Sequence, residues 1–153
     1  MKWHALPRLA CPDVVLHDGQ RPVLIGSRCR HCCEQYFPAS QGCTRCCATE
    51  MEFWPVGSEG KLWSWTVQGF QPKAPYNGGE PEEDFVPYGV GYVEMPGGVK
   101  VESRLTIADP ERLVIGMPMT LTLLPYRQVA GEEPVFTYAF APVEPAADAA
   151  ATA

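Results

Sequence analysis

Two short cysteine motifs constrain this chain more than any other feature of its sequence. The first C-x-x-C pair is Cys29 and Cys32; the second, Cys43 and Cys46, follows after ten intervening residues. Each pair places two thiolates on one side of a tight turn, so two facing turns present four sulfur atoms in a tetrahedron, as in structural zinc sites. An iron site and unliganded thiols are the alternatives. The pattern predicts a zinc ribbon whose closed metal site stabilises a segment with little core of its own.

A further cysteine directly follows each pair, namely Cys33 and Cys47. Knuckle turns favour glycine at this position because the backbone there adopts a positive φ. Either residue could replace Cys32 or Cys46 as a ligand through a C-x-x-x-C spacing, but we interpret both as small side chains beside the site. Cys11 is expected to be a small buried hydrophobic residue.

The remaining global features indicate where such a chain works and what it does not bind. Seven cysteines, an odd number, do not suit a disulfide framework. There is no apolar run of signal-peptide length in the first thirty residues and no stretch long enough to span a bilayer, so we expect a soluble cytoplasmic protein without membrane contact. The net charge of −6 argues against a nucleic-acid binder, although Arg28, Arg30 and Arg45 could form a local basic patch.

The second part of the chain carries the signals of short β-strands. Apolar and β-branched runs recur between Pro- and Gly-rich segments, and a broken, acidic stretch at 69–87 separates the first two runs. One helical turn is expected at 108–113, with Asp109 as its N-cap. The candidate strands are 62–67, 90–95, 99–102, 119–123 and 135–140. Five strands with a helical turn between the third and fourth predict a mainly β fold with an OB-type barrel, a β-sandwich being the alternative.

These signals divide the chain into four parts. We expect an N-terminal segment at 1–21, a zinc ribbon at 22–56, an OB-fold barrel at 57–143 and a disordered, alanine-rich tail at 144–153.

Several of these stretches together resemble the DUF35 family, whose members join a rubredoxin-like zinc ribbon to an OB-fold domain associated with acyl-CoA. Besides the two knuckles, the resemblance rests on the runs Tyr36-Phe37-Pro38, Gly60-Lys61-Leu62-Trp63-Ser64-Trp65-Thr66-Val67, Val90-Gly91-Tyr92-Val93-Glu94-Met95, Gly98-Val99-Lys100-Val101 and Ile115-Gly116-Met117-Pro118. The resemblance covers roughly residues 22–143, most of the chain. Cys33 and Cys47 depart from the family pattern, which has glycine at both positions.

The resemblance implies a non-catalytic accessory subunit that forms a hetero-oligomer with a thiolase-like protein and helps to shape its CoA or acyl-CoA site. In that case the chain has no catalytic residue of its own, and its zinc is structural. Cationic side chains should meet the CoA phosphates, and Lys73, Arg104 and Arg127 are the candidates. The alternatives are an OB-fold protein that binds single-stranded nucleic acid and a free-standing acyl-CoA-binding protein.

Overall fold

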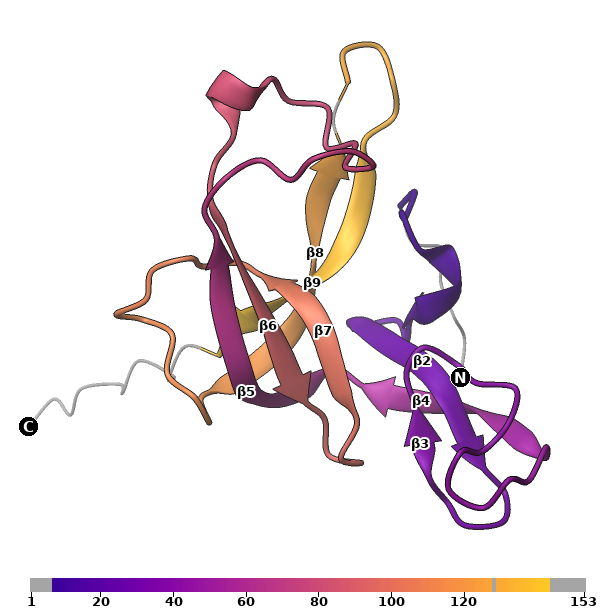
Figure 1. Cartoon of the computed structure of the whole chain (residues 1–153). Coiled ribbons are helices and arrows are strands. Elements are labelled where there is room, and N and C mark those ends of the chain that lie inside the picture. Colours follow the sequence, from indigo (N-terminus) through magenta and orange to yellow (C-terminus); the bar gives the residue numbers. More distant parts are fainter. Residues whose placement is uncertain (1–6, 128, 144–153) are drawn as a thin grey trace, which may run out of the picture.

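The computed structural model describes residues 7–127 and 129–143, which form two β-sheets that share one core. The predicted tail at 144–153 lies outside the described residues. A 3₁₀ turn, η1 (Pro12–Val14), leads into the first sheet, whose strands are β1 (Val15–His17), β2 (Pro22–Cys29), β3 (Gln35–Tyr36) and β4 (Met51–Gly57). The long strand β2 pairs antiparallel with each of the other three. This small sheet carries the two cysteine knuckles and is the ribbon that the sequence predicts (Figure 1).

The second sheet closes on itself. Its strands are β5 (Glu59–Gln68), β6 (Tyr88–Glu94), β7 (Lys100–Leu105), β8 (Pro118–Arg127) and β9 (Val135–Pro142), and a 3₁₀ turn, η2 (Glu82–Asp84), lies between β5 and β6. The strands close in the order β5-β6-β7-β9-β8, with β7 and β9 parallel and the other pairs antiparallel. Five strands in this order form the Greek-key barrel of an OB fold. The mainly β fold and the barrel are confirmed, and the sandwich alternative is wrong because the sheet closes.

Alternation along the strands decides which side chains enter the barrel. On β6 and β7 the inward positions include Val93, Val101 and Leu105, all less than 4% exposed. Gly91 also faces inward, where a Cβ atom would lie 2.8 Å from the carbonyl oxygen of Ser64. The outward positions of the same two strands therefore form a separate face, which is described with the site below.

The helical turn expected at 108–113 is wrong. Asp109 does accept a backbone hydrogen bond from Glu111, but the segment forms a turn without any helix. Only one backbone bond, from the Arg112 amide to the Asp109 carbonyl, closes this turn. The chain then leaves to pair with β5, where the Gly116 amide donates to the Leu62 carbonyl at 2.7 Å, and this tertiary pairing ends the turn before a helix can form.

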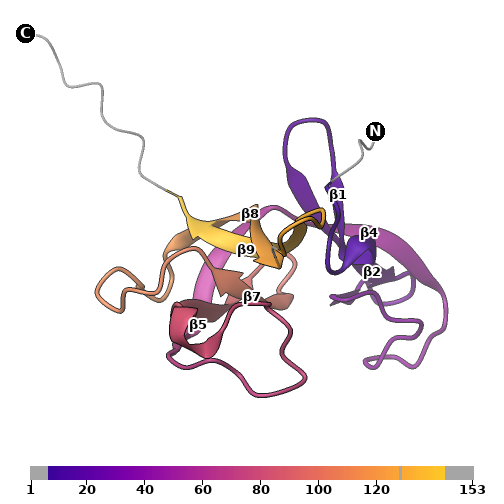
Figure 2. The ribbon, with the colours of Figure 1, turned by 90° about the horizontal axis from the view of Figure 1, so that it is seen from above.

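The ribbon and the barrel are joined by packing as well as by the chain. Val15 of β1 and Leu24 of β2 are buried in one cluster with barrel residues, among them Phe140 of β9. At the junction, the Ser58 hydroxyl donates to the Pro22 carbonyl at 2.6 Å. Seen from above, the ribbon strands β2 and β4 lie beside the barrel (Figure 2). The domain division at residue 57 stays a prediction.

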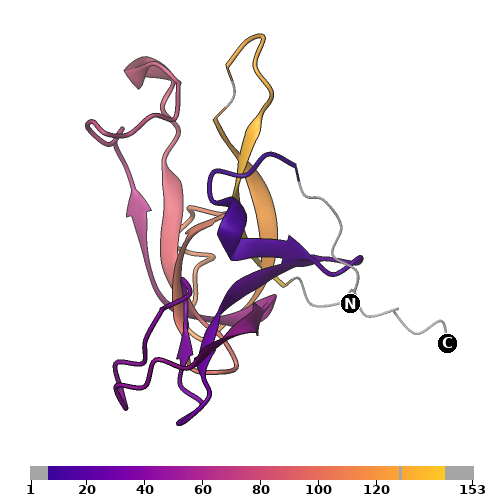
Figure 3. The ribbon, with the colours of Figure 1, turned by 90° about the vertical axis from the view of Figure 1, so that its right-hand side faces the viewer.

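The two ends of the barrel are unlike. The long β5–β6 connection with η2 and the β8–β9 connection rise at one end, whereas the cysteine knuckles lie toward the other (Figures 1 and 3). Among residues 7–127 and 129–143, no helix is long and apolar enough to cross a membrane.

Candidate functional site

The four cysteines of the two C-x-x-C pairs come together in space. The sulfur atoms of Cys29, Cys32, Cys43 and Cys46 all lie within 4.8 Å of one another. The Cys29 and Cys46 sulfurs are 3.6 Å apart, and those of Cys32 and Cys43 are 3.4 Å apart. A tetrahedron of thiolates at zinc–sulfur bond lengths has edges of about 3.8 Å. The cluster therefore has the size and the donor set to bind a metal ion.

Two matching backbone turns build this cluster. The Cys33 amide donates to the Cys29 carbonyl at 3.0 Å, and the Cys47 amide donates to the Cys43 carbonyl at 2.9 Å. Cys33 and Cys47 have φ values of 63° and 60°, the left-handed conformation for which glycine is usual. Both side chains are exposed, and their sulfurs are not among the four that converge.

Hydrogen bonds, burial and neighbouring sulfurs give the clustered thiols different pKa values. The Tyr36 hydroxyl lies 3.2 Å from the Cys43 sulfur, and its hydrogen bond lowers the pKa of Cys43 to about 6. At Cys46 the Ala48 amide favours the thiolate, but burial and the neighbouring sulfurs outweigh it and raise the pKa to about 12. Four adjacent thiolates repel one another, so a bound cation is needed for all four to be ionised together.

The arginines around the knuckles do not form a free basic patch. Arg28 lies 2.7 Å from Glu52 and stacks 3.7 Å from the Trp54 ring centroid. Arg30 is 3.7 Å from the second oxygen of Glu52, and Arg45 is 3.0 Å from Glu34. Arg28 and Arg30 thus share one carboxylate, that of Glu52, and Arg45 has that of Glu34.

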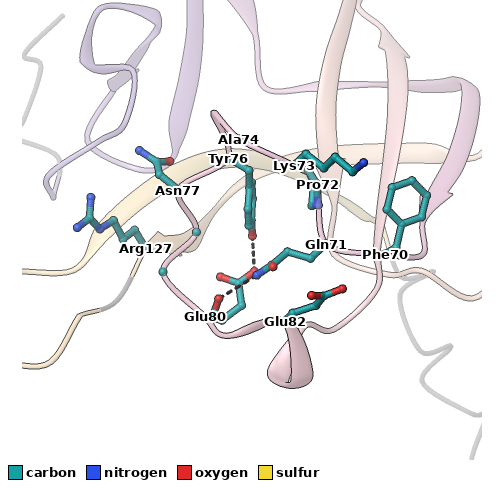
Figure 4. A pocket seen from close by; sticks show the side chains of 12 residues that line it. Phe70, Gln71, Pro72, Lys73, Ala74, Tyr76, Asn77, Glu80, Glu82 and Arg127 are labelled. Carbon is teal, nitrogen blue, oxygen red and sulfur yellow. Dashed lines mark hydrogen bonds between the residues drawn. The ribbon is translucent and has the colours of Figure 1, made fainter.

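The opposite end of the barrel is hollowed by a pocket between the long loop and β8. This pocket has a volume of about 690 Å³, and both Lys73 and Arg127 line it. In Figure 4 these two cations lie on opposite sides of Tyr76. The Tyr76 hydroxyl donates to Glu80 at 2.5 Å, and Gln71 donates to the Glu80 carbonyl at 2.8 Å, as the dashed lines show.

Hydrogen bonds hold the long loop against the barrel. The Tyr126 hydroxyl of β8 donates to the Asn77 side-chain oxygen at 2.6 Å. Within the loop, the bond from Tyr76 lowers the pKa of Glu80, so this carboxylate stays charged. Burial, reinforced by Glu80, raises the pKa of Tyr76, which keeps its proton. The loop that the sequence marks only as broken and polar is therefore held by hydrogen bonds among its own residues and to Tyr126 of β8.

A second hollow lies on the outer face of β6, β7 and β9, and we call it the tyrosine cleft. It has a volume of about 410 Å³ and shares Tyr76 with the first pocket. Arg104 lies in this cleft, with its guanidinium carbon 3.9 Å from the Tyr88 ring centroid. Its lining residues include Tyr76, Tyr88, Tyr126, Tyr138, Arg104 and Glu102.

Two buried guanidinium nitrogens at this end have no protein acceptor. The Nε atoms of Arg104 and Arg127 are shielded from solvent and make no hydrogen bond to any described residue. Within the described ranges, Lys73, Arg104 and Arg127 also have no carboxylate within 4.0 Å. The three residues singled out for CoA phosphates thus lie at one end of the barrel, in two adjoining hollows.

Comparison with known proteins agrees with this architecture. Residues 55–124, from β4 to within β8, match the family model described as the C-terminal OB-fold domain of ChsH2. A DUF35 domain-containing scaffold protein of Methanocaldococcus jannaschii is 29% identical over 133 residues, which cover 84% of this chain and 87% of the relative. Over most of its length the chain is therefore similar to a DUF35 scaffold protein.

Other similar proteins bear the names of enzyme subunits or complexes. The benzoylsuccinyl-CoA thiolase subunit BbsA of Geobacter metallireducens is 29% identical, with 84% of this chain and 82% of the relative covered. BbsA of Thauera aromatica is 31% identical over 88 residues, which cover 58% of this chain and 55% of the relative. The solved Ltp2–ChsH2(DUF35) aldolase shares the fold, with a TM-score of 0.56 and 23% identity over 78% of this chain and 84% of that one.

Sequence reasoning did not find the place of several residues in the structure. Tyr126 and Tyr138 line the tyrosine cleft, and Tyr138 also packs against the buried core cluster. Cys11 was expected to be buried, and this is wrong: it is exposed at the cleft because the N-terminal segment pairs with β9 at its surface. Strand alternation could have placed Tyr88 and Arg104 on an outward face of the barrel. It could not have shown that β9, which is distant in the sequence, lies beside that face.

Proposed function

We propose that this chain is a non-catalytic accessory subunit of a thiolase-type acyl-CoA enzyme complex. The observation that carries the proposal is the extent of its similarity to BbsA of G. metallireducens, which spans 84% of the chain. The relative of M. jannaschii, named a scaffold protein, has the same extent. In this role the partner supplies the catalytic nucleophile, and this chain contributes to the assembly and to the CoA or acyl-CoA site. The BbsA names make benzoylsuccinyl-CoA thiolase one candidate for the complex.

The metal in this proposal is zinc, bound by Cys29, Cys32, Cys43 and Cys46. The short distances between the sulfurs and the tetrahedral donor set support it, since zinc accepts four thiolates without a directional demand of its own. A site with four protein ligands leaves no position for water, so the metal is structural. All seven cysteines are free thiols, which fits a reducing compartment, and we propose the cytoplasm.

The CoA contacts in this proposal come from Lys73, Arg104 and Arg127. Their location at one end of the barrel, without carboxylate partners among the described residues, supports such a role because phosphate oxygens would satisfy their donors. A free-standing acyl-CoA-binding protein would use the same residues and is the second candidate.

Binding of single-stranded nucleic acid is disfavoured on charge. The chain carries a net charge of −6, and the arginines around the knuckles are paired with Glu34 and Glu52. A surface that follows a phosphate backbone needs unpaired cations along its length.

Affinity purification of the tagged chain from its native host tests the proposal. We expect a thiolase-like protein in near-stoichiometric amount, identified by mass spectrometry, and thiolysis of an acyl-CoA by the complex but not by the chain alone. Thiolysis by the isolated chain would contradict a non-catalytic role. Recovery of the chain alone would favour a free-standing acyl-CoA-binding protein. Co-purified nucleic acid would favour the single-stranded nucleic-acid-binding alternative.

A further inference from the structure

The tyrosine cleft has the features of a binding site for a flat ring that carries an anionic group. Four tyrosine side chains, Tyr76, Tyr88, Tyr126 and Tyr138, line one hollow of about 410 Å³, a volume that suits a small organic ligand. Aromatic faces stack on planar rings, and a tyrosine in addition offers a hydroxyl for hydrogen bonding. The outer face of the second and third strands is also where OB barrels bind their ligands, and here those strands are β6 and β7.

Arg104 gives this cleft its anion-binding element. Its guanidinium carbon lies over the Tyr88 ring, 3.9 Å from the centroid, so this contact helps to place the guanidinium before any ligand arrives. Its Nε atom is shielded from solvent and has no acceptor among the described residues. A buried donor without an acceptor is costly, and a phosphate or carboxylate oxygen would remove that cost with a charge-assisted bond.

The acidic residue of the cleft, Glu102, restricts which kind of flat ring can bind there. Glu102 lines the cleft beside Arg104, and its carboxylate accepts a hydrogen bond from Tyr92 at 3.2 Å. A carboxylate has several lone-pair sites, so Glu102 retains the capacity to accept from a further donor. A heteroaromatic ring with an exocyclic amino group offers such a donor, whereas a purely acidic ligand would be repelled.

From these contacts we propose that the tyrosine cleft binds a nucleoside phosphate, with the base among the tyrosines and a phosphate on Arg104. Two sources share this chemistry, namely a free nucleotide and the nucleotide end of a CoA thioester. The second source deepens the proposed function and rests on it. The first would make the cleft an independent ligand site of the barrel.

Calorimetric titration of the full, zinc-loaded chain tests the site. The probes are adenosine 5′-phosphate, adenosine 3′,5′-bisphosphate, CoA, adenosine, inorganic phosphate and a thymidine oligonucleotide. We expect the nucleoside phosphates to bind at least about 10-fold more tightly than adenosine or inorganic phosphate, because only they engage both the stacking and the charge. Tighter binding of CoA than of the bisphosphate would identify CoA as the source, and equal binding would identify a free nucleotide.

Matched variants assign the binding to the cleft. Arg104→Gln should weaken nucleoside-phosphate binding by about 10- to 100-fold, since it removes a charge-assisted bond. Tyr88→Leu should weaken it by about 2- to 30-fold, because it removes the ring over which the Arg104 guanidinium lies. The controls are Arg112→Gln, the same charge change at an exposed residue outside both hollows, and Phe53→Leu, an aromatic truncation at an exposed residue of the ribbon strand β4. Neither should change the affinity.

Three results would overturn the proposal. They are the absence of binding at ligand concentrations of about 1 mM, unchanged affinity in both cleft variants, and binding of the oligonucleotide alone. Affinity purification of the variants, which measures whether the thiolase-like partner is recovered, distinguishes failure of this proposal from failure of the proposed function. An Arg104→Gln chain that keeps its thiolase-like partner but loses nucleotide affinity would support both, whereas nucleotide binding by a chain without such a partner would support the cleft alone.

Discussion

Removal of one of the four clustered cysteines, the ligands of the proposed zinc, should weaken the barrel as well as the ribbon, because the two sheets share a core. The perturbation is Cys43→Ser, which deletes one of the four converging sulfurs. Without the metal, the knuckles lose the bonds that hold the end of β2. Strand β2 carries Leu24, and its partner β1 carries Val15, into the common cluster.

The size of the effect follows from the burial of these two side chains. Val15 is 1% exposed and Leu24 is fully buried. Full burial of such a side chain contributes about 1.5–3 kcal/mol, so their release from the barrel costs about 3–6 kcal/mol. For a chain of this size each kcal/mol shifts the Tm by about 2–4 °C, which gives a fall of about 6–24 °C. The upper end applies when both strands detach completely.

The assay combines metal content with a local measure of barrel stability. Native mass spectrometry should find one zinc ion per wild-type chain and none in the variant, while hydrogen exchange of the amides in β5–β9 should become faster. Cys47→Ser is the matched control, since Cys47 occupies the same knuckle but lies exposed outside the cluster; it should keep both the zinc and the Tm. If Cys43→Ser loses zinc while barrel exchange and Tm stay unchanged, the reasoning from a shared core is wrong.

Two further predictions concern the barrel itself. Tyr76→Phe removes the hydrogen bond that lowers the pKa of Glu80, so an NMR titration should show that pKa rising toward its ordinary value of 4.5, and an unmoved titration would refute the assignment. Because the folded pKa of Glu80 is lowered, its stabilisation of the wild type is present above pH 4.5 and is lost as the pH falls through the folded pKa. This stabilisation should be absent from the variant. Gly91→Ala places a Cβ atom 2.8 Å from the Ser64 carbonyl and should lower the free energy of unfolding by about 1–3 kcal/mol in urea titrations. Gly69→Ala, with no atom within 4 Å, should stay within about 0.5 kcal/mol of wild type, and equal losses in the two variants would contradict the steric account.

The cysteine cluster was within reach of the sequence because its geometry is local. Two residues between paired cysteines fix a tight turn, and the positive φ expected after each pair is found at Cys33 and Cys47. The five barrel strands were also predictable, since period-two alternation and the Pro- and Gly-rich breaks are properties of neighbouring residues. The failed helical turn at 108–113 shows the limit of such local signals: Asp109 caps the turn as expected, but pairing with Leu62, distant in the sequence, redirects the chain.

The tyrosine cleft shows what only the tertiary structure decides. Its walls come from the long loop, β6, β7, β8, β9 and the segment at Cys11. Barrel closure brings β7 and β9 together as parallel neighbours, although β8 and two connections separate them in the chain. The sequence determined the four-cysteine cluster, the strand content and the order of ribbon and barrel, because each depends on contacts between near neighbours. The three-dimensional packing alone decides which outward side chains share a hollow and which cations have no carboxylate partner. Both depend on how strands that are distant in the sequence pair when the barrel closes.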